Sequence, residues 1–386
     1  MDLHATMNTL RVFAASSSDS SSEVQQMLAP SAAFRHPCRT GGLRCLYIRD
    51  FSLENNNNHS AIKEVTVTTK EGETKTRRMK VIPPQYTGLH QLTGLAKYMG
   101  VPIRYVPRKE LVNLCGERRN QNCVLEVGSF KPIKIESTAE LFRKGEEEDT
   151  TSPLYVLYLD HIIDPTNVGN LMRTCFFYNI DHVILSKDCS GCTAVVSRAS
   201  TGFLEYLHVY QSRGSTTDFI KKSKQDDSVS FIATTAHDAG ESGAVPKGED
   251  TTVKGKREVR VLVLGNEDKG LANHVVEQCH YTVHLPSPRQ RALVKQAKEE
   301  RVESTTDTKE EEAAAPPPAE DFVAQRQEKQ RRLCRLRPKE VTLNVNTACA
   351  ALLAQLLANT VQLTRVRPAV TGEQKGEGEN GGPTVV

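Results

Sequence analysis

The segment Asp160–Thr174 follows an apolar run at 154–159 and holds side chains that could bind a ligand. The run predicts a buried strand, and a helix is expected to begin near Asn167. Pro165 presets φ for the first helical turn, while Asp164 or Asn167 can accept hydrogen bonds from the free N–H groups there. The carboxyl ends of strands in α/β sheets commonly carry ligand sites, so this turn is a candidate site.

Within the expected helix, Gly169 and Arg173 are four residues apart and therefore share one face. A glycine below an arginine predicts a concave place where another backbone can approach the guanidinium. The alternative is that Arg173 pairs with a carboxylate on the surface.

A second candidate segment runs from Val261 to Leu271. Its buried strand leads directly into a loop bounded by Gly265 and Gly270, whose backbone groups could face a ligand closely. The spacing of the two glycines resembles a phosphate-binding loop. However, Leu271 and Ala272 occupy the positions where such a loop needs Lys and then Ser or Thr.

The third candidate segment is split by a long insertion. Leu285-Pro286 ends one strand, and Thr342–Ala348 follows the insertion. Asn344 is expected to open a helix rich in small residues, which predicts close packing against a neighbouring element.

Other chemistries have little support in the sequence. The first strand of the large domain is not followed by Gly-x-Gly-x-x-Gly, so a dinucleotide site is not predicted. Cys189 and Cys192 form one Cys-x-x-Cys pair without a second, which favours two loop thiols over a zinc site. No metal centre is expected.

The pattern around these segments predicts an α/β domain with a parallel sheet over residues 153–365. Strands and helices alternate along it. The expected strands are 154–159, 182–185, 206–210, 229–234, 259–264 and 281–285, and the expected helices are 167–178, 193–204, 216–223, 270–278 and 344–359.

Residues 76–130 are expected to form a smaller α/β domain. A helix ends at Gly100, a short strand covers 103–106, and a second helix starts at Pro107. A further strand is expected at 124–127.

The remaining segments are expected to lack a core of their own. Residues 1–75 are predicted to be disordered, as a transit peptide or an ordinary tail, because the start is Arg-bearing, Ser-rich and poor in acids. Residues 131–152 read as a linker, and 366–386 as a disordered tail. The charged insert 287–341 ends in cations at 326–339, either a solvated helix or a contact to an RNA backbone.

Composition narrows the protein class. Of the 386 residues, 38% are hydrophobic and 25% charged, and the formal net charge is +3. This balance excludes a polybasic protein but allows a local basic surface. No apolar run is long enough to cross a membrane. Ten cysteines are too few for a disulfide scaffold, which favours a reduced compartment.

The three candidate segments, in this order, resemble the three motifs of the SpoU-type RNA 2′-O-ribose methyltransferases of the SPOUT superfamily. The resemblance covers about residues 154–360, and Ser197–Glu205 matches a weaker family stretch. Residues 101–126 look like the ribosomal-protein-L30-like substrate domain of the subgroup that modifies large-subunit rRNA. The implied fold is a trefoil-knotted α/β methyltransferase domain preceded by a small L30e-like α/β substrate-binding domain.

The resemblance implies S-adenosyl-L-methionine as cofactor and a homodimer that acts on large-subunit rRNA. Arg173, Asn167, Glu267 and Asn344 would be the catalytic residues. Cofactor-binding positions would be Thr234, Gly265, Asn266, Glu267, Gly270, Leu271, Leu285, Pro286, Thr342, Leu343 and Asn344. Arg173 and Asn167 of one subunit would lie near the cofactor of the other. Arginine keeps its proton in proteins, so Arg173 is expected to stabilise a developing alkoxide, with Glu267 or a phosphate relaying the proton.

The sequence departs from the family pattern at several positions. Asn179 stands where a glycine is expected, Thr342 and Asn346 where serines are expected, and Asn120-Gln121-Asn122 where the pattern is His-Gln-Gly. We expect a ribose methyltransferase acting on guanosine in organellar rRNA, in mitochondria or otherwise in the cytoplasm. The alternatives are a catalytically inactive RNA-binding ribosome assembly factor and an enzyme acting on tRNA.

Overall fold

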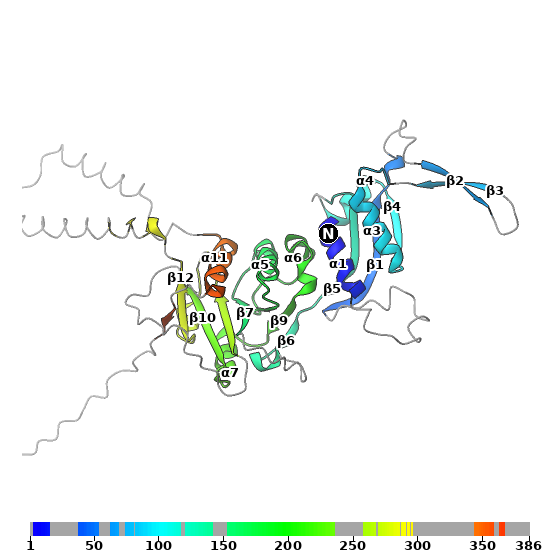
Figure 1. Cartoon of the computed structure of the whole chain (residues 1–386). Coiled ribbons are helices and arrows are strands. Elements are labelled where there is room, and N and C mark those ends of the chain that lie inside the picture. Colours follow the sequence, from blue (N-terminus) through cyan, green and yellow to red (C-terminus); the bar gives the residue numbers. More distant parts are fainter. Residues whose placement is uncertain are drawn as a thin grey trace, which may run out of the picture.

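The computed structural model describes residues 3–15, 38–53, 62–68, 74–80, 82–116, 120–141, 153–235, 258–267, 269–285, 287–290, 292–293, 295, 343–358 and 363–366. These residues form two α/β units, each built on its own sheet, and a separate two-stranded hairpin (Figure 1). Among them, no helix combines the length and the apolar character that a membrane span requires.

The larger sheet has eight strands in the order β13-β12-β10-β11-β7-β8-β9-β6. Their bounds are β6 Ile133–Ile135, β7 Leu154–Leu159, β8 His182–Leu185, β9 His208–Ser212, β10 Val229–Thr235, β11 Val259–Leu264, β12 Tyr281–His284 and β13 Thr364–Arg365. Every neighbouring pair is parallel except β12 and β13. The predicted parallel α/β sheet is therefore confirmed.

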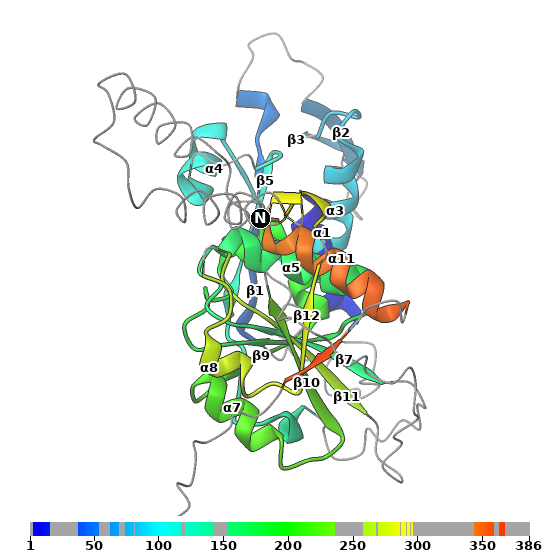
Figure 2. The same cartoon turned by 90° about the vertical axis from the view of Figure 1, so that its left-hand side faces the viewer.

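Helices cover both faces of this sheet. One face carries α5 (Pro165–Phe177), α6 (Ala194–Ala199), the 3-10 turn η5 (Phe203–Tyr206) and α11 (Val345–Leu357), and the other carries α7 (Thr216–Ser223) and α8 (Asn273–Val276). Figure 2 shows α5 and α11 side by side above the strands.

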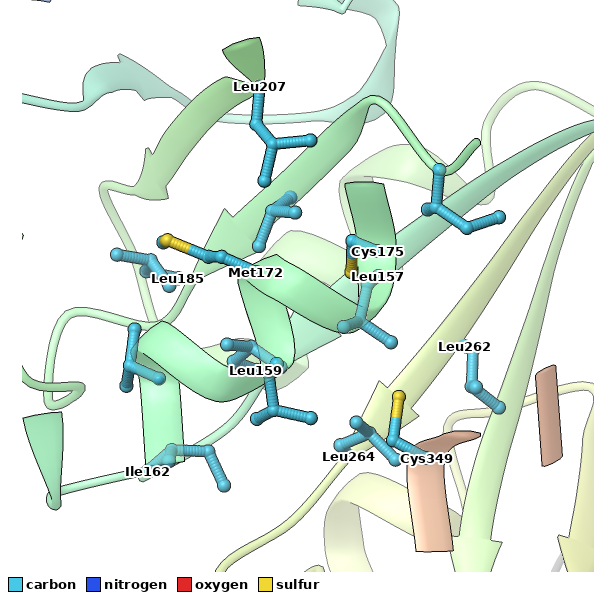
Figure 3. Close-up of a cluster of buried hydrophobic side chains, with 14 of the residues drawn as sticks. Leu157, Leu159, Ile162, Met172, Cys175, Leu185, Leu207, Leu262, Leu264 and Cys349 are labelled. Carbon is cyan, nitrogen blue, oxygen red and sulfur yellow. The ribbon is translucent and has the colours of Figure 1, made fainter. Parts of the chain in front are cut away.

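The hydrophobic core has two halves, one on each face of the sheet, because successive side chains of a strand point to opposite faces. On β7, Leu157 and Leu159 face the helices α5 and α11, while Val156 and Tyr158 face α7 and α8. Figure 3 shows Met172 and Cys175 of α5 above Leu157, with Cys349 of α11 beside Leu264. All these side chains are buried, which explains the nearly continuous apolar sequence of the central strands.

Two expected helices are shorter than predicted. The helix expected over 193–204 ends as α6 and continues as η5, because the chain reverses at Gly202 with φ of +81°. The helix expected over 270–278 is reduced to α8, because Gly270 pairs with Asn266 in a β-bridge instead of entering a helix.

The smaller unit contains a three-stranded sheet in the order β4-β1-β5. Its elements are α1 (Leu3–Ala15), β1 (Arg39–Arg49), the turn η2 (Phe51–Leu53), α3 (Thr87–Tyr98), β4 (Ile103–Val106), α4 (Arg108–Cys115) and β5 (Cys123–Phe130). The hairpin of β2 (Ile62–Thr68) and β3 (Thr74–Lys80) lies in the chain between η2 and α3.

The expectation that residues 1–75 are disordered is wrong for much of that range. Helix α1 packs against α3, and its Leu10 and Phe13 are fully buried. Strand β1 is the central strand of the small sheet, parallel to β4 and antiparallel to β5. The unit therefore includes residues far before position 76.

The linker expected at 131–152 is also partly wrong. Strand β6 extends the large sheet beside β9, and Ile135 and Leu141 are buried in its core. Most of the insert 287–341, including the cations at 326–339, lies outside the described residues, as does the tail beyond Val366.

The two units are joined by a buried ion pair. Arg39 of β1 donates from Nε to both carboxylate oxygens of Glu205 in η5, at 3.1 and 3.0 Å, and from Nη1 to the carbonyl of Gly128 at 2.8 Å. The two side chains are 5% and 0% exposed. Nearby, Asn8 of α1 donates to the carbonyl of Thr201 at 2.9 Å. The segment Ser197–Glu205 thus forms the contact between the units.

Candidate active site

Three predicted catalytic residues meet at the carboxyl edge of the large sheet. Asn167 lies in the first turn of α5, Glu267 follows β11, and Asn344 is the N-cap of α11. The amide of Asn344 donates to Glu267 Oε1 at 2.7 Å and lies 3.5 Å from Asn167 Oδ1. The same Glu267 oxygen accepts from the backbone N–H of Val345 at 3.2 Å. Glu267 therefore ties the loop after β11 to the start of α11.

Asn346 completes this cluster, although the sequence analysis treats it only as a departure from the family pattern. Its Nδ2 donates to Asn167 Oδ1 at 2.9 Å and to Asn344 Oδ1 at 2.8 Å. Its Oδ1 is buried and has no hydrogen-bond partner among the described residues. The sequence signal that could have indicated this role was the Asn-x-Asn spacing at a helix start. There the Asn344 side chain accepts a hydrogen bond from the N–H of Asn346 at 2.9 Å.

The start of α5 follows the predicted capping. Asp164 is the N-cap, its carboxylate accepts from the N–H of Thr166 at 2.8 Å, and Pro165 occupies the first helical turn. Asn167 is consequently free of the capping role, and its side-chain oxygen accepts from Asn346.

The loop between Gly265 and Gly270 is closed on itself. The N–H of Gly270 donates to the carbonyl of Asn266 at 2.8 Å, and Gly270 has φ of +64°. A Cβ atom on Gly265 would lie 2.4 Å from both Gly270 C and Leu271 N, and 2.6 Å from Gly270 O. Because these neighbours are backbone atoms, position 265 accepts no side chain unless the loop opens.

Replacing Gly265 with alanine is therefore expected to lower the affinity for S-adenosylmethionine by about tenfold or more, because the added methyl group displaces backbone atoms that form the loop. Isothermal titration with the cofactor measures this effect. Gly191→Ala is the matched control, since a Cβ there would meet nothing within 4 Å. Equal affinities of the two variants would contradict a cofactor role for the loop.

The other predicted cofactor-binding residues contact different parts of this edge of the sheet. Thr234 donates its hydroxyl to the carbonyl of Val263 at 3.0 Å, and Asn266 Nδ2 donates to the carbonyl of His161 at 3.0 Å. These two side chains thus hold neighbouring strands and loops. Of the remaining predicted residues, Leu271 is buried, Leu285 packs against the core and Leu343 is exposed. Pro286 and Thr342 lie outside the described residues.

Arg173, the fourth predicted catalytic residue, does not contact the cluster of Asn167, Glu267 and Asn344 among the described hydrogen bonds. Arg173 is exposed on α5, and the described hydrogen bonds of Asn167, Glu267 and Asn344 do not include it. Another backbone does approach at Gly169, as expected, because a Cβ there would lie 2.5 Å from Ala199 Cβ and 2.6 Å from the carbonyl of Val196, so α6 leaves no open space at this glycine. Gly169 allows α6 to pack closely on α5.

A buried polar group that the sequence analysis missed supports the same edge of the sheet. Asp160 Oδ1 accepts from Thr216 Oγ1 at 2.5 Å and lies 3.0 Å from His161 Nδ1. His161 has φ of +55°, which turns its carbonyl toward Asn266. Burial raises the pKa of the adjacent Tyr158 to about 12, so its hydroxyl remains a donor.

Of the two thiols near this edge, Cys192 is buried and Cys189 is partly buried. Cys189 Sγ contacts the carbonyl of Leu159 at 3.1 Å. Burial raises the pKa of Cys189, and that of Cys192 to about 12, so both stay protonated. Within the described part of the chain, no group of three His, Cys, Asp or Glu side chains is arranged to hold a metal ion.

Comparison with known proteins gives one family match and several relatives. Residues 154–293 match the SpoU rRNA Methylase family. The chain is 28% identical over 204 residues to the TrmH-family protein YacO of Bacillus subtilis, covering 51% of this chain and 72% of that protein. It is 32% identical over 135 residues to mitochondrial rRNA methyltransferase 1 of Saccharomyces cerevisiae, covering 34% and 32%. For the human protein of the same name the identity is 27%, covering 52% and 56%.

Solved structures show weaker similarity. The SpoU methyltransferase AviRb of Streptomyces viridochromogenes is 14% identical with a TM-score of 0.44, covering 82% of each chain. An RNA 2′-O ribose methyltransferase structure is 16% identical with a TM-score of 0.40, covering 70% of this chain and 76% of that one. The matched segment spans about a third to a half of the yeast and human mitochondrial relatives.

Proposed function

Because residues 154–293 match the SpoU rRNA Methylase family, we propose that this chain transfers a methyl group from S-adenosylmethionine to a ribose 2′-hydroxyl of rRNA. The observation that carries this proposal is the cluster of Asn167, Glu267 and Asn344, which unites the three sequence motifs beside the closed Gly265 loop.

Two features support a cofactor site here. The backbone of Gly270 and Leu271 lies so close to Gly265 that no side chain fits there. Main-chain groups are therefore left to contact a ligand. The buried Oδ1 of Asn346 is an acceptor that would gain from a donor on a bound molecule. Gly265, Gly270 and Leu285 would hold the cofactor through main chain, with Leu343 as an apolar contact.

S-adenosylmethionine supplies an electrophilic methyl group on a sulfonium. The protein has to favour ionisation of a hydroxyl whose pKa is far above 7, and an adjacent guanidinium does so by stabilising the alkoxide. Arg173 would supply this cation. Glu267 would orient Asn344 and could pass the proton on through its second carboxylate oxygen, since Oε1 already accepts two hydrogen bonds.

A homodimer would bring Arg173 to the cluster. Phe177 at the end of α5 is 79% exposed, and Leu357 at the end of α11 is 40% exposed. Ile163 and Leu343, which precede the same two helices, are also exposed. Exposed apolar side chains at the ends of two neighbouring helices favour a partner surface. The family resemblance implies that a second copy there would bring its Arg173 near the Asn167 cluster.

The finer assignments rest on the resemblance and on the relatives. The unit around β4-β1-β5 would be an L30e-like domain that binds large-subunit rRNA, and the target would be a guanosine ribose. The methyltransferase domain would be a trefoil knot. The mitochondrial names of several relatives favour a mitochondrial location.

Binding and activity together test the proposal. Purified full-length protein is titrated with S-adenosylmethionine and incubated with large-subunit rRNA and radiolabelled cofactor, and 2′-O-methylation is mapped in the RNA. Binding together with label at a ribose supports the proposal. Cofactor binding without transfer to rRNA or tRNA, or no binding at all, would instead support an inactive RNA-binding assembly factor. The presence of Thr342 and Asn346, where the family motif has serines, favours this alternative.

A further inference from the structure

A hollow of about 320 Å³ lies in the smaller unit, where the start of α3 meets the turn before β5. Its lining residues are Gln85, Tyr86, Thr87, Gly88, Leu89, Gln121 and Asn122. None of these residues belongs to the cluster of Asn167, Glu267 and Asn344. In Figure 1, α3 lies in a different unit from α11.

An aromatic stack supports one wall of this hollow. The rings of Tyr86 and Phe51 are stacked, with centroids 4.8 Å apart and planes inclined by 28°. The guanidinium of Arg49 lies over the same Phe51 ring, 5.1 Å from its centroid. The ring of Tyr86, only half buried, is thus held in a fixed orientation at the edge of the hollow.

Carboxamide side chains form the opposite part of the lining. Gln121 and Asn122 have φ of +48° and +67°, so two consecutive residues adopt left-handed backbone. The turn is fixed because Asn122 N–H donates to Asn120 Oδ1 at 3.1 Å, and Asn122 Oδ1 accepts from Arg49 Nη1 at 3.1 Å. This second bond occupies the Asn122 oxygen and leaves its Nδ2 to donate.

Backbone donors add to the polar lining. Helix α3 begins at Thr87, and its N-cap Tyr86 makes no side-chain capping bond. The N–H groups of Tyr86 and Leu89 donate to the carbonyls of Pro83 and Tyr86 at 3.0 Å each, so Thr87 and Gly88 supply the remaining N–H groups of this helix start. The hollow therefore combines an aromatic face with carboxamide and backbone hydrogen-bonding groups, which are the means by which proteins bind unpaired nucleobases.

We propose that this hollow binds one unpaired nucleobase of the RNA substrate, stacked on Tyr86 and hydrogen bonded by Gln121 and Asn122. The proposal rests on the proposed function, because it takes the substrate to be RNA. The bound base would anchor the RNA at a distance from the ribose that is methylated.

Short single-stranded RNA carrying one 2-aminopurine tests this, because stacking on an aromatic ring quenches the fluorescence of that base. Wild-type protein is expected to quench it on binding. Tyr86→Leu is expected to bind about tenfold more weakly and to lose the quenching, since it removes one stacking contact. Tyr86→Phe keeps the ring and is expected to behave like wild type.

Gln121→Ala tests the hydrogen bonds, because it removes the carboxamide of an exposed side chain. It is expected to reduce discrimination among RNAs that differ only in the base at the labelled position. Tyr98→Leu is the matched control: Tyr98 is an aromatic residue at the far end of α3, 77% exposed and outside the hollow.

Two results would overturn the proposal. One is equal quenching and affinity for wild type, Tyr86→Leu and Tyr98→Leu. The other is no quenching by the wild-type protein with any single-stranded RNA. Quenching that depends on Tyr86 together with a lack of methyl transfer would count against the proposed activity but not against the nucleobase site.

Discussion

Replacing Arg173 with alanine is expected to lower the rate of methyl transfer by about 10²–10³-fold, while S-adenosylmethionine binds within a few fold of wild type. Arg173 is exposed on α5 and makes no described contact with the Asn167 cluster, so its loss should not disturb the fold. The expected loss comes from removing a cation that stays protonated and faces a developing negative charge.

Single-turnover transfer and cofactor titration measure the two quantities separately. Lys221→Ala is the control, because Lys221 is an exposed cation on α7, which covers the other face of the sheet. A loss of cofactor affinity in Arg173→Ala would show that Arg173 is structural, and the alkoxide role would be wrong.

A site shared between subunits predicts complementation of two inactive variants. Arg173→Ala is co-expressed with Gly265→Trp, which blocks the loop after β11 in its own subunit. Mixed dimers then hold one complete site, so activity should recover to about a quarter of wild type, since about half of the dimers are mixed. If tagged mixed dimers show no recovery, each subunit uses its own Arg173.

Truncating Phe13 to alanine is expected to lower the free energy of unfolding by about 3–5 kcal/mol. The side chain is fully buried in the core that α1 forms with α3 and β1, where it lies with Leu10 and Leu46. Its removal leaves a cavity that a helix also held against η5 cannot easily close. Urea denaturation of the full chain measures the change.

Arg11→Ala is the matched control on the same helix, because Arg11 is exposed. Its unfolding free energy should change by about 0.5 kcal/mol or less. An unfolding curve for Phe13→Ala that matches wild type would mean that α1 is not part of the cooperative fold.

Much of the larger domain is predictable from sequence because its signal is local. Strands such as Leu154–Leu159 and Val259–Leu264 are short apolar runs bounded by turn residues, and the structure places them at those bounds. Alternation with helices implies a parallel sheet, whose strand ends share one edge. That rule fits the meeting of Asn167, Glu267 and Asn344 in one chain, whereas the family resemblance placed Asn167 near the cofactor of the other subunit.

The amino-terminal helix shows where local signal is ambiguous. The Arg-bearing, Ser-rich, acid-poor start was compatible with a transit peptide or with an ordinary tail, and neither predicts a packed helix. Only the partners decide, because Leu10 and Phe13 are buried by α3 and β1, which lie far along the chain. Strand β6 was missed for a similar reason: three residues carry little periodicity, and its pairing partner β9 is distant in sequence.

Within residues 154–357 the sequence alone thus determined the order of the main strands and helices, the parallel sheet, the turn chemistry of Asp164-Pro165 and the identity of the three motifs. The tertiary structure decided that Asn346 joins the Asn167 cluster, that Gly169 faces α6 instead of a ligand, and that Arg39 and Glu205 link the units. The physical reason is the distance along the chain over which each interaction acts. Propensity and capping act within a few residues, whereas burial, close backbone approach and charge pairing depend on which distant segments the fold brings together.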